Sequence, residues 1–185
     1  MNIFYLSSDP KTCAEYHCDK HVVKMIIEYA QLLSTAHRIL DGKENKVLSN
    51  SGKTMTSQWK LDDHREKILY KNAYVNHPSN IWVRCADTHY VYLLDLWNNL
   101  SHEFTKRYGH VHTTWKKLVQ HLHVLPKNID RNVGFKVPPQ CMPDELKIAG
   151  TNDPEKNTID AYRNFYKAHK SEFATWKTEI PTWFN

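Results

Sequence analysis

Residues 9–40 carry two unlike stripes of side chains at helical spacing, and this pattern constrains the fold more than any other feature of the chain. At about 100° per residue, one broad face is apolar and consists of Val22, Met25, Ile26, Tyr29, Leu32, Leu33, Ala36 and Leu40. Another face is polar and consists of His17, His21, Lys24, Glu28, Gln31 and Thr35. The pattern predicts a long helix packed against a core, with a polar stripe that either faces solvent or lines a cleft.

Capping residues and helix breakers divide the rest of the chain. Asp9-Pro10 is a typical helix start, and Asp41-Gly42 is a typical helix end. Gly109 ends a second apolar pattern that begins after His77. Helices are therefore expected at residues 9–40, 78–108, 113–121 and 157–177.

The remaining segments are predicted to be mostly irregular. They are a short extended segment at 2–6, a loop-rich excursion at 41–76 with a short helix near 61–70, a Pro-rich irregular stretch at 124–157 and an aromatic tail at 178–185. We therefore expect an all-α fold: a compact single domain over residues 1–185, with three main long helices plus short helices.

Composition narrows the class of protein. The net charge is +5 with twelve further histidines, which mildly favours an anionic partner such as nucleic acid. The four cysteines form no CxxC pair, and the first residues lack a signal-peptide pattern. No apolar run approaches the roughly 20 residues of a membrane span. We expect a cytoplasmic monomer of phage or bacterial origin, with no membrane association.

The polar stripe holds the main catalytic candidates. His21 and Glu28 project in the same direction two turns apart, and Lys24 lies between them, so they could transfer protons or stabilise a cation in a cleft. The alternative is a solvated face with an ordinary Lys24–Glu28 pair. Cys13, His17 and His21 could also bind a metal, as in a metal-dependent hydrolase, but no second ligand cluster supports this.

Basic and aromatic residues elsewhere are candidates for DNA binding. His77 and Arg84 lie near the start of the second long helix, where phosphate could bind, although a plain helix start explains them too. Arg107 lies at a helix C-terminus, where a cation is favourable without any ligand. The C-terminal region interleaves cations with aromatic rings, which serves either base stacking or docking onto the domain; its candidates are Lys167, Lys177, Trp183 and Phe184.

These residues resemble a known family. The run Asp19-Lys20-His21 followed by Glu28 is similar to the first-helix motif of the pyrimidine-dimer DNA glycosylases of the T4 endonuclease V type. The turn Arg107-Tyr108-Gly109 and the tail Pro-Thr-Trp-Phe at 181–184 also look like elements of that family. The order of elements is similar over most of the chain, and about a dozen positions match in detail.

The resemblance implies a DNA N-glycosylase with AP-lyase activity that needs no cofactor and no metal. The N-terminal amine would attack C1′ of the damaged nucleotide, Glu28 would stabilise the cationic sugar and move protons, and His21 would orient the site. Two features depart from the family pattern. Asn2 is too bulky for efficient removal of Met1, so the amine is expected on Met1. The arginines that flank the family's glutamate correspond to Ile27 and Gln31, so Lys20 and Lys24 would have to supply the charge.

Two other functions remain open. A modified base could replace the pyrimidine dimer as substrate, or the chain could bind nucleic acid without catalysis. The second of these predicts salt-sensitive binding that does not depend on Glu28.

Overall fold

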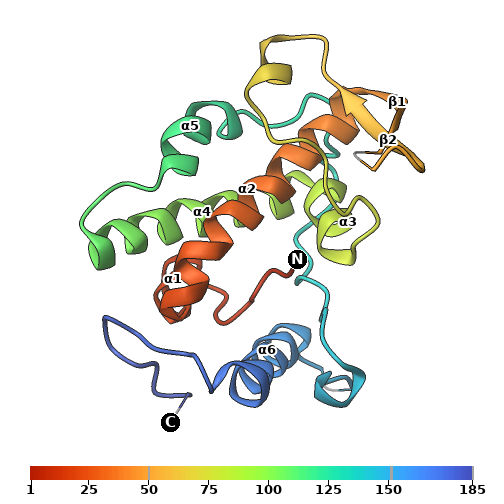
Figure 1. Cartoon of the computed structure of the whole chain (residues 1–185). Coiled ribbons are helices and arrows are strands. Elements are labelled where there is room, and N and C mark those ends of the chain that lie inside the picture. The colour runs from red at the N-terminus through yellow and green to blue at the C-terminus, as the bar shows by residue number, and fades with distance from the viewer. Residues whose placement is uncertain (50, 151, 185) are drawn as a thin grey trace.

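Helix α2 (Asp19–Asp41) runs through the middle of the computed structural model and contacts α3, α4 and α5 (Figure 1). The structure describes residues 1–49, 51–150 and 152–184. The predicted apolar stripe is buried: Val22, Ile26, Leu32 and Leu33 have no exposed surface. α1 packs against α4 instead, and the side chains of the elements form a single cluster of buried apolar residues.

The helix predicted at residues 9–40 is two helices. α1 (Pro10–Tyr16) begins at the predicted Asp9 cap, whose carboxylate accepts a hydrogen bond from the Thr12 N–H at 2.7 Å. His17 and Cys18 then adopt extended backbone, and α2 begins after them. The polar stripe thus divides, with His17 in the connection and the other five residues on α2.

The second predicted long helix is also divided. α3 (Pro78–Cys85) and α4 (Asp87–Tyr108) are separated by Ala86, which has φ −153° and ψ 147°. α4 ends as predicted at Gly109, whose φ of 74° lies in the left-handed region that glycine tolerates best. The predicted helices at 9–40 and 78–108 are therefore each divided into a short helix and a long one.

The all-α prediction is wrong. β1 (Lys43–Leu48) and β2 (Met55–Lys60) form an antiparallel hairpin within the segment expected to be loop-rich. Nearly all side chains of β1 and half of those of β2 are exposed, and none is fully buried. Neither segment shows the apolar alternation that marks a half-buried strand. A short 3₁₀ helix, η1 (His64–Lys67), lies within the range of the short helix expected near 61–70.

The C-terminal third follows the prediction more loosely. α5 (Thr113–Leu122) begins where expected, whereas α6 (Pro154–Lys170) begins and ends earlier than predicted. Apart from a short 3₁₀ helix, η2 (Asp144–Leu146), the described residues between 124 and 153 are irregular. The last position of the predicted tail, Asn185, lies outside the described residues. None of the described helices is both long and apolar enough to cross a membrane.

Residues 2–6 form a buried strap rather than a strand. Ile3, Phe4, Tyr5 and Leu6 are at most 5% exposed. The strap passes between α2 and α6, because the ring of Phe4 contacts rings on both helices (Figure 1). The first residue of the chain is thereby held close to the middle of α2.

Candidate active site

The strap places the α-amino nitrogen of Met1 beside the polar stripe of α2. This nitrogen lies 4.0 Å from Glu28 Oε2, and Lys24 Nζ lies 3.0 Å from Glu28 Oε1. The side chain of Glu28 is 17% exposed, whereas that of Lys24 is 65% exposed. One sheltered carboxylate thus contacts an α-amine and a lysine through different oxygens, and three of the predicted site residues lie together.

Hydrogen bonds along the strap fix the position of the amine. The Phe4 N–H donates to the Tyr29 hydroxyl at 3.2 Å, and Asn2 Nδ2 donates to the Cys141 carbonyl at 2.8 Å. Ile3, between these two anchors, has no exposed surface. With the Asn2 side chain and the Phe4 backbone both anchored, the amine has little freedom to leave Glu28.

His77 belongs to the same site. It is the N-cap of α3, where its Nδ1 accepts a hydrogen bond from the Ser79 N–H at 3.2 Å. Partial burial lowers the pKa of His77, and the positive charge of the Met1 amine lowers it further, while Glu28 acts in the opposite direction. A neutral His77 with Nδ1 engaged in this way presents its Nε2–H as a donor.

His21 lies elsewhere, in an aromatic cluster. Its ring stacks on Phe4 with centroids 4.5 Å apart, and its Nδ1 is hydrogen-bonded to the Tyr166 hydroxyl. Burial lowers the pKa of His21 to about 2, with smaller contributions from His17 and nearby lysines. His21 is therefore neutral at physiological pH and supports the strap that carries the amine.

Two lysines, Lys20 and Lys170, lie over the ring of Phe173. We refer to these two residues and Lys24, whose charge acts on Lys170, as the lysine cluster. The ring centroid of Phe173 lies 4.8 Å from Lys20 Nζ and 5.9 Å from Lys170 Nζ. Partial burial lowers the pKa of Lys170, and the charge of Lys24 lowers it further. In such an arrangement the cations can bind a phosphate while the aromatic ring stacks on a base.

Lys170 and Phe173 were not among the predicted site residues. The predicted helix extended to residue 177 and would have placed Phe173 on a helical face. α6 instead ends at Lys170, and Phe173 lies in the turn that follows. The alternation of cations and aromatic residues in this region indicated DNA binding. Which of these residues lie at the site, however, depended on where the helix ends.

Arg84 and Arg107 bind within the protein. Arg84 Nη1 donates to the Val75 carbonyl at 2.8 Å and to Asn80 Oδ1 at 3.1 Å, which fixes the segment before α3. The side chain of Arg107 has no exposed surface and forms ion pairs with Asp19 at 3.0 Å and Glu103 at 2.7 Å. Both arginines are therefore engaged in holding the fold.

The predicted tail packs on the domain. The ring centroid of Trp183 lies 5.9 Å from that of Tyr16 and 6.0 Å from that of Tyr166. The ring centroids of Phe184 and Trp176 are 4.7 Å apart. Lys177 is exposed, with Nζ 4.5 Å from the ring centroid of Tyr108. Lys167 is exposed on α6. Trp183 thus covers α1 and α6, Phe184 packs on Trp176, and the two lysines lie at the surface.

The geometry does not favour metal binding by the N-terminal histidines. His17 Nδ1 is hydrogen-bonded to the Cys13 carbonyl at 2.7 Å, and Nε2 is hydrogen-bonded to the Tyr29 hydroxyl at 2.8 Å. Both ring nitrogens of His17 are therefore engaged. Within the described part of the chain, no three His, Cys, Asp or Glu residues are placed to hold a metal ion.

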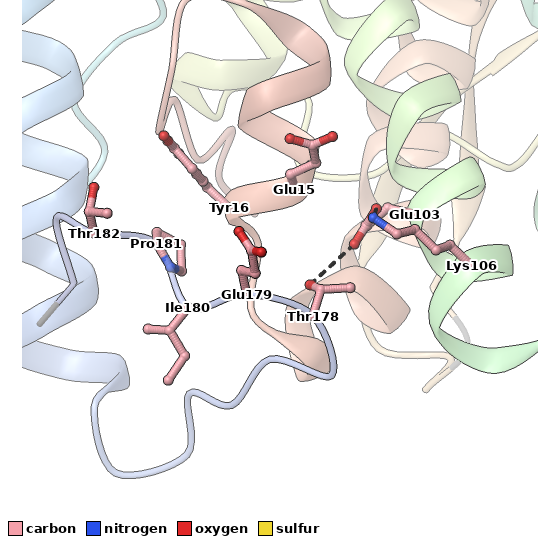
Figure 2. A pocket seen from close by; sticks show the side chains of 9 residues that line it. All are labelled: Glu15, Tyr16, Glu103, Lys106, Thr178, Glu179, Ile180, Pro181 and Thr182. Carbon is pink, nitrogen blue, oxygen red and sulfur yellow. Dashed lines mark hydrogen bonds and ion pairs between the residues drawn. The ribbon is translucent and has the colours of Figure 1, made fainter.

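A separate cavity of about 630 Å³ lies between α1, α4 and the tail (Figure 2). Its walls carry the carboxylates of Glu15, Glu103 and Glu179 and a single amine, that of Lys106. Glu103 is engaged with Arg107 and with Thr178, as the dashed line in Figure 2 indicates for the latter. This excess of negative charge repels phosphate, so the cavity does not suit the anionic partner expected from the composition.

Comparison with known proteins found no relative of this chain. No protein-family model, no curated protein and no solved structure matched the chain.

Proposed function

We propose that the chain is a DNA N-glycosylase with AP-lyase activity on damaged or modified pyrimidines. One observation carries the proposal: the Met1 α-amino nitrogen lies 4.0 Å from the sheltered carboxylate of Glu28. An amine nucleophile beside a carboxylate is the pair of groups that imine chemistry at a sugar carbon requires.

In the first step the neutral amine of Met1 attacks C1′ of the target nucleotide. The C1′–N bond breaks, its electron pair leaves with the base, and the base takes up a proton. Glu28 accepts the proton that the attacking amine loses, and a carboxylate in this position also stabilises positive charge on the sugar.

In the second step the protonated Glu28 passes its proton to O4′ and the sugar ring opens, which leaves an imine between the Met1 nitrogen and C1′ and returns Glu28 to its carboxylate form. Loss of a C2′ proton then forms the C2′–C3′ double bond, and the 3′ phosphate leaves with the C3′–O electron pair. Glu28 is placed to receive the C2′ proton. Hydrolysis of the imine releases the cleaved strand and restores the amine.

The surroundings of the pair supply contacts for DNA. The lysine cluster adjoins Glu28 through Lys24 and offers cations for the phosphates that flank the target. Phe173 presents an aromatic ring among these cations, on which a base taken out of the stack can pack.

The decisive experiment incubates the protein with duplex DNA that contains an abasic site and then adds borohydride, which reduces an imine to a stable adduct. We expect a covalent adduct and strand nicking. Adding one glycine before Met1 moves the amine by about 3.5 Å and should abolish the adduct while DNA binding is retained. An adduct that persists unchanged in the extended protein would exclude Met1 as the nucleophile.

Glu28→Gln tests the role of the Glu28 carboxylate. The variant should bind DNA with unchanged affinity but form product at least about a hundred-fold more slowly, as expected when a positioned acid or base is removed. Glu145→Gln, at an exposed carboxylate on η2, is the matched control and should retain full activity. A Glu28→Gln variant as active as the control would remove Glu28 from the mechanism.

The lysine cluster also supports a second candidate, a nucleic-acid-binding protein without catalysis, because these cations could bind phosphate without the amine. In that case no adduct forms, and salt-sensitive binding survives both Glu28→Gln and the added glycine. The same two proteins therefore distinguish the candidates.

A further inference from the structure

The hairpin of β1 and β2 carries an exposed apolar pair near its turn. Leu48 is 60% exposed and Met55 is 59% exposed. The two residues are partners in the strand register, so their side chains lie directly opposite each other on one face of the ribbon. Lys46, two residues before Leu48, lies on the same face. Two large apolar side chains thus face solvent together instead of packing on the domain.

The hairpin that carries this pair has a net positive charge. Residues 43–60 contain four lysines and one acidic residue, Glu44. Lys46 Nζ lies 3.3 Å from Glu44 and donates a hydrogen bond to Ser57 Oγ at 2.6 Å, whereas Lys53 is exposed in the turn segment. An apolar tip flanked by cations matches a surface that offers both phosphates and apolar sugar edges.

Hydrogen bonds connect the base of the hairpin to the polar stripe of α2. Thr35 Oγ1 accepts a hydrogen bond from the Ala73 N–H at 3.2 Å. The next residue towards the hairpin, Asn72, accepts from the Trp59 N–H at 3.1 Å and donates to the Ser57 carbonyl at 3.1 Å. The hairpin therefore starts from the face of α2 that carries Glu28, and Figure 1 shows it at the C-terminal end of that helix.

The dimensions suit a duplex that lies along this face. Glu28 and Thr35 are separated by two helical turns, or about 10 Å along α2. The five residue steps from Lys60 to Met55 add up to about 17 Å. With the helix and the strand in line along the duplex, at 3.4 Å per base pair, the tip lies about eight base pairs from the nucleotide at Glu28.

We propose that the hairpin is a second DNA-binding element, in which Leu48 and Met55 enter the minor groove while Lys46 and Lys53 contact the flanking phosphates. Apolar side chains on extended elements enter the minor groove in this way and open base steps there. The inference rests on the proposed function, since it takes duplex DNA as the ligand.

Three duplexes with one abasic site test the proposal. One has 16 base pairs on both sides of the site, and the other two have only four base pairs on one side or on the other. Four base pairs extend about 14 Å and end before the tip, so only one of the short-armed duplexes should lack the hairpin contact. Leu48→Ser/Met55→Ser should bind about ten-fold more weakly to the two duplexes that retain the long arm on the hairpin side. Its affinity for the third duplex should equal that of the wild type.

Two further variants separate the contributions. Lys46→Ser/Lys53→Ser should reduce the slope of log affinity against log salt by about two on the same two duplexes. Val124→Ser is the matched control, because Val124 is 62% exposed outside the hairpin, and it should bind all three duplexes like the wild type. Thermal unfolding of each variant confirms that the fold is retained.

The outcomes distinguish this inference from the proposed chemistry. Equal affinity of the wild type and Leu48→Ser/Met55→Ser for the 16-base-pair duplex overturns the hairpin contact, as does an equal loss on all three duplexes. A wild-type protein that binds no duplex overturns it as well. If the wild type forms no borohydride-trapped adduct but the arm-dependent loss is observed, the chemistry is wrong and the hairpin contact stands.

Discussion

The Phe4 N–H donates a hydrogen bond to the Tyr29 hydroxyl, which lies 3.2 Å away and belongs to the residue that follows Glu28 on α2. Consecutive residues on a helix project about 100° apart, so Glu28 faces the site while Tyr29 faces the core. One turn of α2 thus supplies both the carboxylate and the anchor of the strap that brings the amine to it.

Tyr29→Phe should therefore affect both stability and chemistry. Loss of the hydroxyl leaves the Phe4 N–H and a ring nitrogen of His17 without partners in the core, which costs about 1–3 kcal/mol of the free energy of unfolding. The amine also becomes less well placed, so borohydride trapping should slow more than DNA binding weakens. Urea unfolding and the trapping rate measure the two effects.

Tyr90→Phe is the matched control for that experiment. The buried Tyr90 hydroxyl donates to the Leu122 carbonyl and is hydrogen-bonded to His37 Nε2, far along the chain from the strap. We expect a similar loss of stability with an unchanged trapping rate. If trapping slowed equally in Tyr29→Phe and Tyr90→Phe, the hydrogen bond from Phe4 to Tyr29 would affect trapping only through the stability of the fold.

Arg107→Met should destabilise the protein by about 3–5 kcal/mol, because it leaves the carboxylates of Asp19 and Glu103 buried without their main partner. Lys106→Met removes a 63% exposed lysine beside the same Glu103 and should change stability by less than about 0.5 kcal/mol. Urea unfolding compares the two. If Arg107→Met instead kept its stability and lost only DNA affinity, Arg107 would be a phosphate contact.

Acid should destabilise the fold through three buried histidines. Burial lowers the pKa of His17 and His37 to about 4 and that of His21 to about 2. Between about pH 6.5 and pH 4 the unfolded chain binds protons that the folded chain does not, so the free energy of unfolding falls as pH falls. Each histidine contributes at most about 1.4 kcal/mol per pH unit. Urea unfolding at pH 7.5 should show higher stability than at pH 5.5, and equal values would contradict these burial effects.

The variant His77→Asn separates the role of His77 as a helix N-cap from a role in the reaction. Asparagine is a good N-cap, so stability should change by less than about 0.5 kcal/mol. The imidazole donor near Met1 and Glu28 is lost, so we expect slower trapping with an unchanged dissociation constant for DNA. His112→Asn is the control, because His112 caps α5 in the same way by accepting from the Thr114 N–H at 3.1 Å. A trapping rate that is unchanged by His77→Asn would leave His77 with a capping role alone.

The sequence predicted the parts of the fold that depend on local periodicity. The apolar stripe of α2 is buried as its spacing indicated, since a period of 3.6 residues marks one helical face directly. The break at His17 was missed because no Gly or Pro marks it. The His17 carbonyl instead accepts a hydrogen bond from Arg107 Nη1 at 2.8 Å, and the Asp19 N–H donates to the Thr175 carbonyl. These partners bind the free backbone groups at the helix ends and are distant in sequence. A local sequence pattern therefore cannot predict the break.

The same reasoning explains the site. The stripe put Lys24 and Glu28 on one face from spacing alone, and the structure places them in contact. The position of the Met1 amine depends on how the strap crosses the core, which spacing does not encode; only the family resemblance suggested it. Lys170 and Phe173 depend on where α6 ends, and the hairpin depends on strands too exposed to show alternation.

The path of the strap also sets an order of events during synthesis. Residues 2–6 leave the ribosome early, yet Phe4 packs against Phe165 and Tyr166 on α6, and Asn2 is bonded to Cys141. The Met1 nitrogen therefore gains its fixed position only after most of the polypeptide has been made. A nascent or prematurely terminated chain would carry the same amine but would lack the partners that hold it against its carboxylate.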